Sequence, residues 1–154
     1  IDDLPVFVFT SADAQFRGFE AVADAEVARI GGVDLHADAA IDYVRASAAG
    51  SDLPRIPPLS GLFGLEARAA LGEARIEVEY AARQNRVAAF ERATDAYAMI
   101  NAHVSLRPFG EDRPTVRIAI DNLNDVEARQ HTSFLKDLAP LPGRKFKISV
   151  DGMF

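Results

Sequence analysis

Apolar and polar residues alternate one by one along most of this chain, and this period of two constrains the fold more than any other feature. Between Gly32 and Tyr43 the odd positions are all apolar, while the even positions include Asp34, His36 and Asp38. Successive side chains of a β-strand point to opposite faces, so a strand here has one apolar and one acidic face. A helix would spread the aspartates around its circumference. The alternation therefore predicts an extended strand.

The same alternation recurs six more times along the chain. Apolar residues occupy every second position in 19–27, 63–71, 74–80, 98–106, 116–120 and 146–154. Seven strands are therefore predicted, and the apolar run Val6–Phe9 is a weaker candidate for an eighth. Most of these strands exceed the five or six residues that are usual in soluble proteins. Spans of roughly 9 to 11 residues are what a tilted strand needs to cross a bilayer.

The segments between the predicted strands alternate in length. The short connections are 29–32, the turn at Gly72 and 108–113, and the long ones are 46–60, 85–95 and 124–144. Outer-membrane barrels have short periplasmic turns and longer extracellular loops. If the last strand runs toward the periplasm, every short turn falls on the periplasmic side. The connections therefore favour an antiparallel meander.

The composition excludes several classes of function. The 154 residues carry a formal net charge of −6 with no basic cluster, which argues against a nucleic-acid surface. There is no cysteine, so thiolate metal sites and cysteine nucleophiles are excluded. No apolar run approaches the roughly 18 to 20 residues of a transmembrane helix, which excludes helical spans only. No G-x-S-x-G, H-E-x-x-H or P-loop motif occurs, and we expect neither an enzyme nor a bound cofactor.

Two architectures share this alternation. A soluble β-sandwich or barrel turns its apolar faces inward, and it would bury Ile41, Val78, Ile100 and Ile148 together in a dry centre. A membrane barrel turns the same face toward lipid and lines a wet interior with charges. Strand length, the alternating connections and the mixed signs of the polar face favour the membrane. Aromatic residues near strand ends on the apolar face, as in interfacial girdles, are Tyr43, Tyr80 and Phe154.

The C-terminal segments narrow the interpretation further. Asn122-Leu123-Asn124-Asp125 closes one predicted strand, and the segment His131–Asp137 reads H-T-S-F-L-K-D. Pro142-Gly143-Arg144 then precedes a last alternating strand that ends at Phe154. This order resembles the C-terminus of TonB-dependent outer-membrane receptors, which commonly reads N-L-x-D, then P-G-R, then a last strand with a terminal aromatic residue. The order and spacing carry the resemblance, because no single tetrapeptide is specific.

Two earlier segments extend the resemblance to nearly all 154 residues. Ala14–Glu20 is similar to a family segment that opens a descending strand, and Leu53–Pro58 is similar to a family loop. The R-I-P-P and H-T-S-F-L-K-D segments are most similar to receptors that import metals, zinc among them. In this family the terminal aromatic, here Phe154, belongs to the signal that the barrel-assembly machinery reads.

The resemblance implies an all-β fold and a place for the chain in a larger protein. Residues 1–154 would be the C-terminal portion of a 22-stranded transmembrane β-barrel, about seven or eight meander strands, without the plug domain and its TonB box. Seven or eight strands cannot close such a barrel, and open strand edges are not tolerated in lipid. Either the chain is a fragment or another chain completes the sheet. Closure as an eight-stranded barrel is a less favoured alternative.

The implied function is import of a scarce nutrient across the bacterial outer membrane. Candidate cargoes are a ferric siderophore, haem, cobalamin, a sugar or a metal ion. The implied partners are the outer-membrane bilayer, the remainder of the receptor, TonB acting through the plug, and the barrel-assembly machinery. The alternative from another class is a soluble β-sheet binding module with no transport role.

Histidines are the candidate metal ligands of this chain. His131 lies in the longest predicted outer loop, and Asp137 follows six residues later. Imidazole combined with carboxylate suits zinc, so we predict His131 and Asp137 as metal ligands. The alternative is that His131 is a solvated loop residue. His36 and His103 belong to the polar face of their strands.

Overall fold

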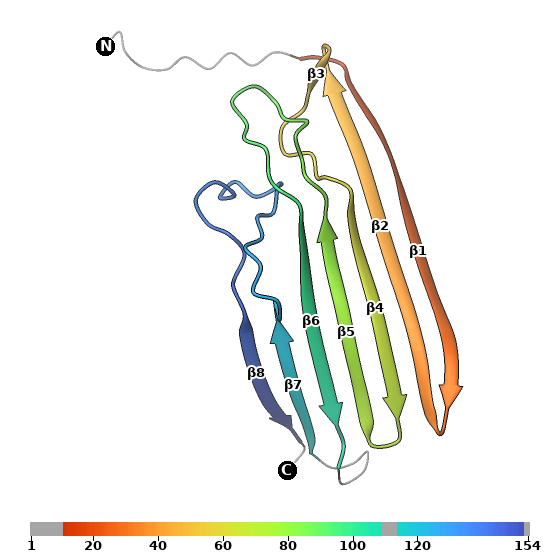
Figure 1. Ribbon diagram of the computed structural model, residues 1–154. Helices are drawn as coiled ribbons and strands as arrows, with labels where there is room; N and C mark the ends of the chain where they lie inside the picture. The colour runs from red at the N-terminus through yellow and green to blue at the C-terminus, as the bar shows by residue number, and fades with distance from the viewer. Residues whose placement is uncertain (1–10, 109–113, 153–154) are drawn as a thin grey trace.

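The predicted meander forms one layer of antiparallel strands in the computed structural model, which describes residues 11–108 and 114–152 (Figure 1). The strands are β1 Ala14–Ile30, β2 Val33–Ala48, β3 Ser51–Asp52, β4 Ser60–Ala69, β5 Gly72–Ala81, β6 Tyr97–Leu106, β7 Thr115–Asp121 and β8 Lys145–Asp151. Their order in the sheet is β1-β2-β4-β5-β6-β7-β8, with the short β3 paired to the end of β2. Within the described ranges β1 and β8 are not paired, so the sheet is open.

All seven predicted long strands are confirmed. β1 and β2 have 17 and 16 residues and are longer than their alternation predicts, whereas β3 lies inside the predicted loop 46–60 and was not predicted. The candidate strand Val6–Phe9 and the terminal Phe154 lie outside the described residues. No helix in the described ranges is long and apolar enough to cross a membrane.

One register shift corrects the predicted face of β1. Glu26 pairs with His36 and Ala28 pairs with Leu35, so Val27 is the extra residue of a bulge. Beyond the bulge Ala28, rather than Val27, continues the apolar face. A bulge shifts the side-chain alternation by one residue and increases the local twist.

The hairpin that follows the bulge closes through a two-residue turn. Gly31 and Gly32 both have positive φ, 56° and 82°. A type I′ turn requires this conformation at both central residues and matches the twist of the flanking strands. Two glycines in succession therefore set the register of β1 against β2.

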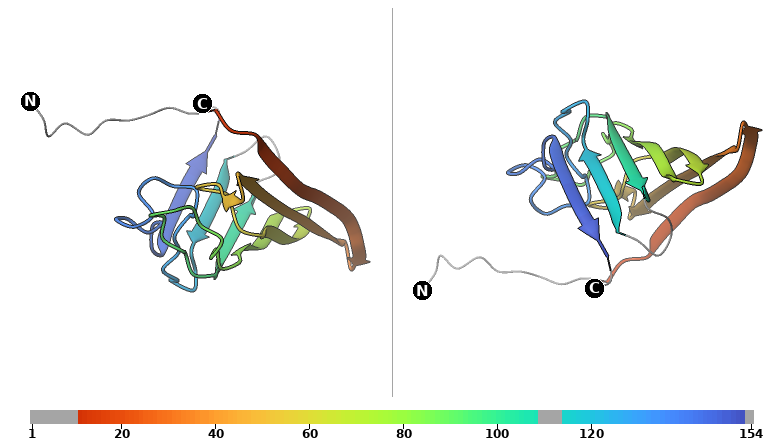
Figure 2. Two further views of the ribbon diagram at one scale, coloured as in Figure 1. Left: turned by 90° about the horizontal axis from the view of Figure 1, so that it is seen from above. Right: turned by 90° about the horizontal axis from the view of Figure 1, so that it is seen from below.

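The apolar face of the sheet is not covered by any other described part of the chain. The views along the strands in Figure 2 show the strands in a single curved layer. Phe19 is 58% exposed and Ile148 is 76% exposed. Of the residues that a soluble sandwich would bury together, Ile41, Val78 and Ile100 are only half-buried. The dry centre of a soluble sandwich is therefore absent from the described sheet.

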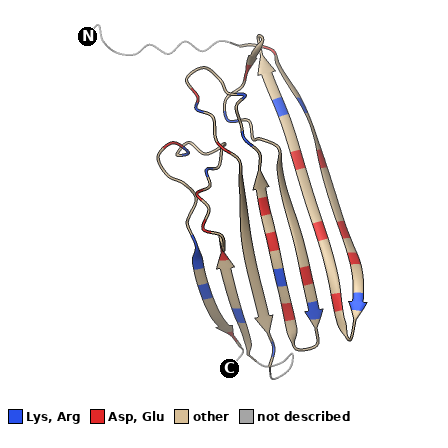
Figure 3. Cartoon of the chain, viewed as in Figure 1, with Lys and Arg blue, Asp and Glu red and all other residues tan. Residues whose placement is uncertain are grey.

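The opposite face carries the charges and is partly covered at one end. Charged residues lie on every long strand except β6 (Figure 3). At the end with the long connections, a small hydrophobic cluster joins this face to the segment before β8. Its members are Ala81, Tyr97, Met99 and Ala128, with Val126 and Leu141 packed against them. The connecting segments therefore fold over the polar face and leave the apolar face open.

The charge-free part of the apolar face has the height of a membrane band. On β2 no Lys, Arg, Asp or Glu belongs to this face between Val33 and Tyr43. A strand rises about 3.4 Å per residue, so this stretch is about 34 Å long. Tilted by about 35–45°, as barrel strands are, it is about 25 Å tall, which is the height of the lipid-facing band of outer-membrane barrels. Tyr43 and Tyr80 lie at its long-loop end, at the positions predicted for an aromatic girdle.

A charge placed in the middle of the apolar face tests which medium this face meets. Ala39 lies midway along β2, between Ala23 of β1 and Phe63 of β4. In lipid, Ala39→Arg should lower the free energy of unfolding by about 2–4 kcal/mol. Val22→Arg, on the polar face of β1 opposite Ala40 and 72% exposed, should cost less than about 1 kcal/mol. Urea unfolding of the full-length protein in lipid vesicles measures both, and equal costs would contradict the assigned orientation.

Candidate functional site

Three loops lie at one end of the sheet and form the candidate site. We name them loop A (53–59), loop B (82–96) and loop C (122–144). Each follows or precedes strands whose polar faces are adjacent in the sheet. In a barrel with short periplasmic turns, loops of this length face the outside of the cell.

Asn122 holds the two ends of loop C together. Its side chain is 1% exposed and its φ is 54°, a left-handed conformation that asparagine tolerates. The side-chain amide donates to the carbonyl oxygens of Val126 (2.9 Å) and Pro142 (3.2 Å), and its oxygen accepts the N–H of Val126 (2.9 Å). The N-L-N-D and P-G-R segments, which the sequence shows 17 residues or more apart, are therefore in direct contact.

The next polar residues of this motif tie loop C to the sheet. The Asn124 side chain donates to the carbonyl of Ala98 (2.8 Å) and accepts the N–H of Ile100 (3.0 Å). It therefore pairs with the backbone of β6 where the partner strand β7 has ended. Asp125 accepts the N–H of Arg144 at 2.9 Å. The prediction that the segment Asn122–Asp125 closes a strand is confirmed, because β7 ends at Asp121.

The three loops meet at the carboxylate of Glu91. It accepts the backbone N–H of Arg55 in loop A (2.9 Å), the N–H of Ala88 in loop B (3.1 Å) and the ammonium of Lys136 in loop C (2.9 Å). Burial by itself raises the pKa of Glu91, but the hydrogen bonds from Lys136 and the two backbone groups outweigh it and lower this pKa. Glu91 is therefore ionised at neutral pH and joins all three loops.

His131 belongs to the same buried network. Its side chain is almost fully buried, so the alternative of a solvated loop histidine is wrong. Nδ1 lies 2.9 Å from the hydroxyl of Thr94, and Nε2 lies 3.3 Å from Glu91. Burial lowers the pKa of His131, and the charge of Lys136 lowers it further, against the opposing effect of Glu91. A neutral ring fits these contacts if Nε2–H donates to Glu91 and Nδ1 accepts from Thr94.

The predicted metal ligands His131 and Asp137 lie in different surroundings. Asp137 is exposed at the surface, whereas His131 is buried beside the ammonium of Lys136 at 3.3 Å. Among the described residues no group of three His, Asp or Glu side chains could hold a metal ion. Metal binding by this pair stays a prediction, and it would need further ligands and displacement of Lys136.

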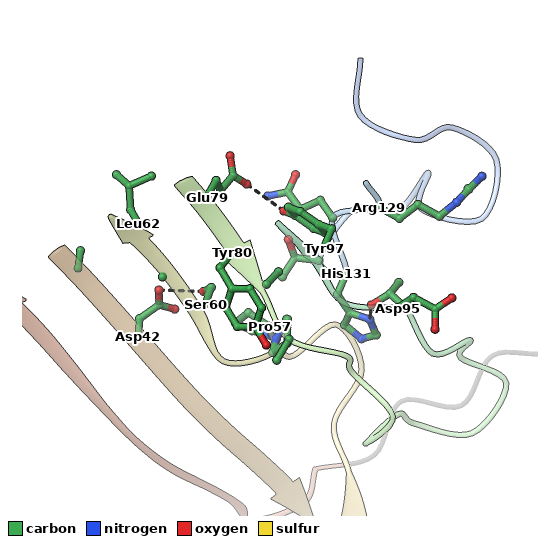
Figure 4. A pocket seen from close by; sticks show the side chains of 18 residues that line it. Asp42, Pro57, Ser60, Leu62, Glu79, Tyr80, Asp95, Tyr97, Arg129 and His131 are labelled. Atoms are coloured by element: carbon green, nitrogen blue, oxygen red, sulfur yellow. Dashed lines mark hydrogen bonds between the residues drawn. The ribbon is translucent and has the colours of Figure 1, made fainter. Parts of the chain in front are cut away.

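A hollow of about 260 Å³ lies between the polar face of the sheet and loops B and C (Figure 4). On its strand side Asp42 accepts the hydroxyl of Ser60 (2.8 Å) and Glu79 accepts the hydroxyl of Tyr97 (2.9 Å). His131 lines it from loop C. The hollow therefore offers carboxylate and hydroxyl oxygens to a polar or cationic ligand.

Nearer the middle of the sheet, Arg75 joins three strands across the polar face. From β5 it pairs with Asp38 of β2 at 2.9 Å, with Glu66 of β4 at 3.9 Å and with Glu77 of its own strand at 3.0 Å. Between Arg75 and Asp38 lies Gly64 of β4, where an added Cβ would stand 2.2 Å from the guanidinium. Because glycine has no side chain, the Arg75 side chain can cross β4 at this position and reach Asp38.

This chain is similar to a known protein in its fold. No family model matches the chain, and no curated protein sequence matches it. Its structure is similar to that of the copper transporter OprC, with a TM-score of 0.77 and 23% identity over 92% of this chain. The sheet is a segment of a β-barrel. The chain spans 24% of the length of OprC, so the strands described above correspond to about a quarter of that protein.

Replacement of Asn122 tests the clamp on loop C. Asn122→Ala leaves the N–H and carbonyl of Val126 and the carbonyl of Pro142 without their partners. We expect the free energy of unfolding to fall by about 2–4 kcal/mol and protease cleavage within loop C to accelerate. Asn85→Ala, the same change at an exposed residue of loop B, is the control and should change neither. Similar behaviour of the two variants would contradict the clamp.

The loop network should weaken in mildly acidic solution. The folded-state pKa of His131 lies below its ordinary 6.5, so the network has its full stability above about pH 6.5 and loses it as the pH falls. Glu91 titrates below its ordinary 4.5, so the window from pH 6.5 to 5 reports His131. The hydrogen-exchange protection factors of the mutually bonded N–H groups of Gln84 and Thr94, corrected for the intrinsic exchange rate at each pH, should fall there. The fall should be absent in His131→Gln, and its persistence would exclude His131 as its cause.

Proposed function

We propose that this chain is part of an outer-membrane receptor that captures a scarce nutrient outside the cell and imports it through a barrel. The observation that carries the proposal is the contrast between the two faces of one sheet. One face is free of charge over about 25 Å, and the other carries charges, a hollow and three loops. Such a sheet separates lipid from water, and a soluble binding module would leave its apolar face exposed.

The inner face favours a cationic cargo, because carboxylates outnumber cationic side chains there. Its carboxylates are Glu20, Asp24, Glu26, Asp34, Asp38, Asp42, Glu66, Glu73, Glu77, Glu79, Asp121 and Asp151, and its cations are Arg29, Arg68, Arg75, Arg117, Lys145 and Lys147. Walls of one sign raise the local concentration of the opposite ion. A metal ion is thus the cargo class we favour, and the likeness to the copper transporter OprC supports it.

In this proposal the remaining parts of the receptor supply what the chain does not contain. A plug would close the barrel, and TonB acting on that plug would supply energy, as the sequence resemblance implies. The chain itself supplies barrel wall and three outer loops. The terminal Phe154, which lies outside the described residues, would serve recognition by the barrel-assembly machinery.

Metal uptake by cells that produce the full receptor tests the function. A deletion strain should grow poorly on one limiting metal among copper, zinc and iron, and the parent gene should restore growth. Glu20→Gln combined with Asp24→Asn removes two inward carboxylates that form no ion pair with Lys or Arg in the described structure. We expect initial uptake of that metal to fall about threefold or more at low salt, and less at high salt.

Asp13→Asn, compared with Glu20→Gln alone, is the matched control. It removes one carboxylate from an exposed position outside the sheet, and uptake should stay within about a factor of 1.5 of the parent. Normal growth of the deletion strain on every limiting metal would contradict a metal receptor. A chain that folds and stays monomeric in plain buffer without detergent would contradict the membrane location.

A further inference from the structure

Two outward-facing arginines lie just beyond the charge-free band, at its long-loop end. Arg17 of β1 and Arg45 of β2 are direct cross-strand neighbours. They lie two residues beyond Phe19 and Tyr43, whose ring centroids are 5.9 Å apart, so the alternation turns all four to the same face. With the rise and tilt of barrel strands, two residues correspond to about 5 Å in height. The two guanidinium groups therefore lie just beyond the aromatic residues that end the charge-free band.

This arginine pair has no counter-charge within the described chain. Within residues 11–108 and 114–152 no carboxylate lies within 4 Å of the Arg17 or Arg45 guanidinium, whereas Arg68 and Arg75 on the inner face are both paired. Like charges directly opposite each other on neighbouring strands destabilise a sheet. A bound anion would convert this repulsion into attraction.

Arg86 of loop B extends the pair into a patch of three arginines. Its guanidinium lies 5.6 Å from the centre of the Tyr43 ring. Arg86 and Arg45 line one small hollow, together with Asp52, whose carboxylate is more than 4 Å from both guanidinium groups. The patch thus continues from β1 over β2 to loop B along the outer edge of the sheet.

Neutral hydrogen-bonding groups complete this patch. Gln15 and Ser47 are cross-strand neighbours one step above the arginine pair. With Arg17 and Arg45 they line a shallow hollow of about 160 Å³. The hollow is therefore lined by two guanidinium groups, one amide and one hydroxyl, and it has no carboxylate in its lining.

We propose that this arginine patch binds the phosphate of a lipid headgroup in the outer leaflet. The proposal rests on the proposed function, because it needs the apolar face to lie in lipid. Guanidinium groups bind phosphate oxygens in a bidentate manner, and the phosphate supplies the charge that the Arg17–Arg45 pair lacks. Acyl chains would extend from it over Phe19 and Tyr43. A free phosphate would gain nothing from this apolar surface, so the position favours a lipid.

Lipid binding to the purified full receptor in a neutral detergent tests the proposal. The probe is diphosphoryl lipid A, and phosphatidylcholine is the probe without net charge. Arg17→Gln with Arg45→Gln should weaken lipid A binding roughly 25-fold, about fivefold for each arginine. Arg83→Gln with Arg92→Gln removes two arginines of the same loop end outside the patch and should change binding less than about twofold. Arg17→Lys with Arg45→Lys keeps the charge and should show an intermediate loss.

The outcomes separate this proposal from the proposed function. Folding of every variant is checked by the resistance of the barrel to heat denaturation in detergent. Equal lipid A binding by the folded glutamine variant and the parent overturns the lipid site and leaves the receptor proposal intact. Displacement of lipid A by millimolar inorganic phosphate also overturns it, because the site would then recognise a free anion. Retained binding in the presence of phosphate and its loss in the glutamine variant support the lipid site.

Discussion

The structure depends on one constraint. Because the sheet is a single layer, each strand must carry apolar side chains on one face and polar side chains on the other. Every strand solves it by the same alternation, and the register keeps the two faces aligned from strand to strand. Ala39, for example, has apolar partners on both sides, Ala23 and Phe63. A slip of one residue would exchange all inward and outward side chains of a strand. Register is therefore the property that the turns and glycines of this chain have to secure.

Charges on the two faces are treated differently as a result. On the inner face an arginine can reach carboxylates two strands away, as Arg75 reaches Asp38 across Gly64. The side chains of such networks are half-exposed, so each charge is stabilised both by its ion-pair partners and by water. On the outer face charge is excluded over the band and returns at Arg17 and Arg45, which form no ion pair with any described carboxylate. Arginine thus forms ion pairs on the inner face, whereas on the outer face it lies beyond the charge-free band.

Much of the fold could be predicted from the sequence, because alternation is a local signal. The long strands, their two faces and the placement of long loops at one end all follow from it, and the asparagines after β7 suit a turn by their own conformational preference. The bulge at Val27 escaped prediction because alanine and valine fit either face. The loop network escaped it because its contacts join distant residues, Arg55 with Glu91 and Glu91 with Lys136, 36 and 45 positions apart. Nothing in the local sequence of a polar loop distinguishes a buried glutamate from a solvated one.

The composition of this network bears on how the outer loops can move. An apolar core would stabilise the loops through many weak van der Waals contacts. Here the single carboxylate of Glu91 accepts hydrogen bonds from groups in loops A, B and C. Removing the partner of a buried charge costs several kcal/mol, because the charge that remains is uncompensated. Displacement of one loop therefore removes a partner of Glu91 and destabilises the contacts of the other two loops with this carboxylate. Loops joined in this way should open together, which is the behaviour that the proposed import of a cargo through the barrel would require.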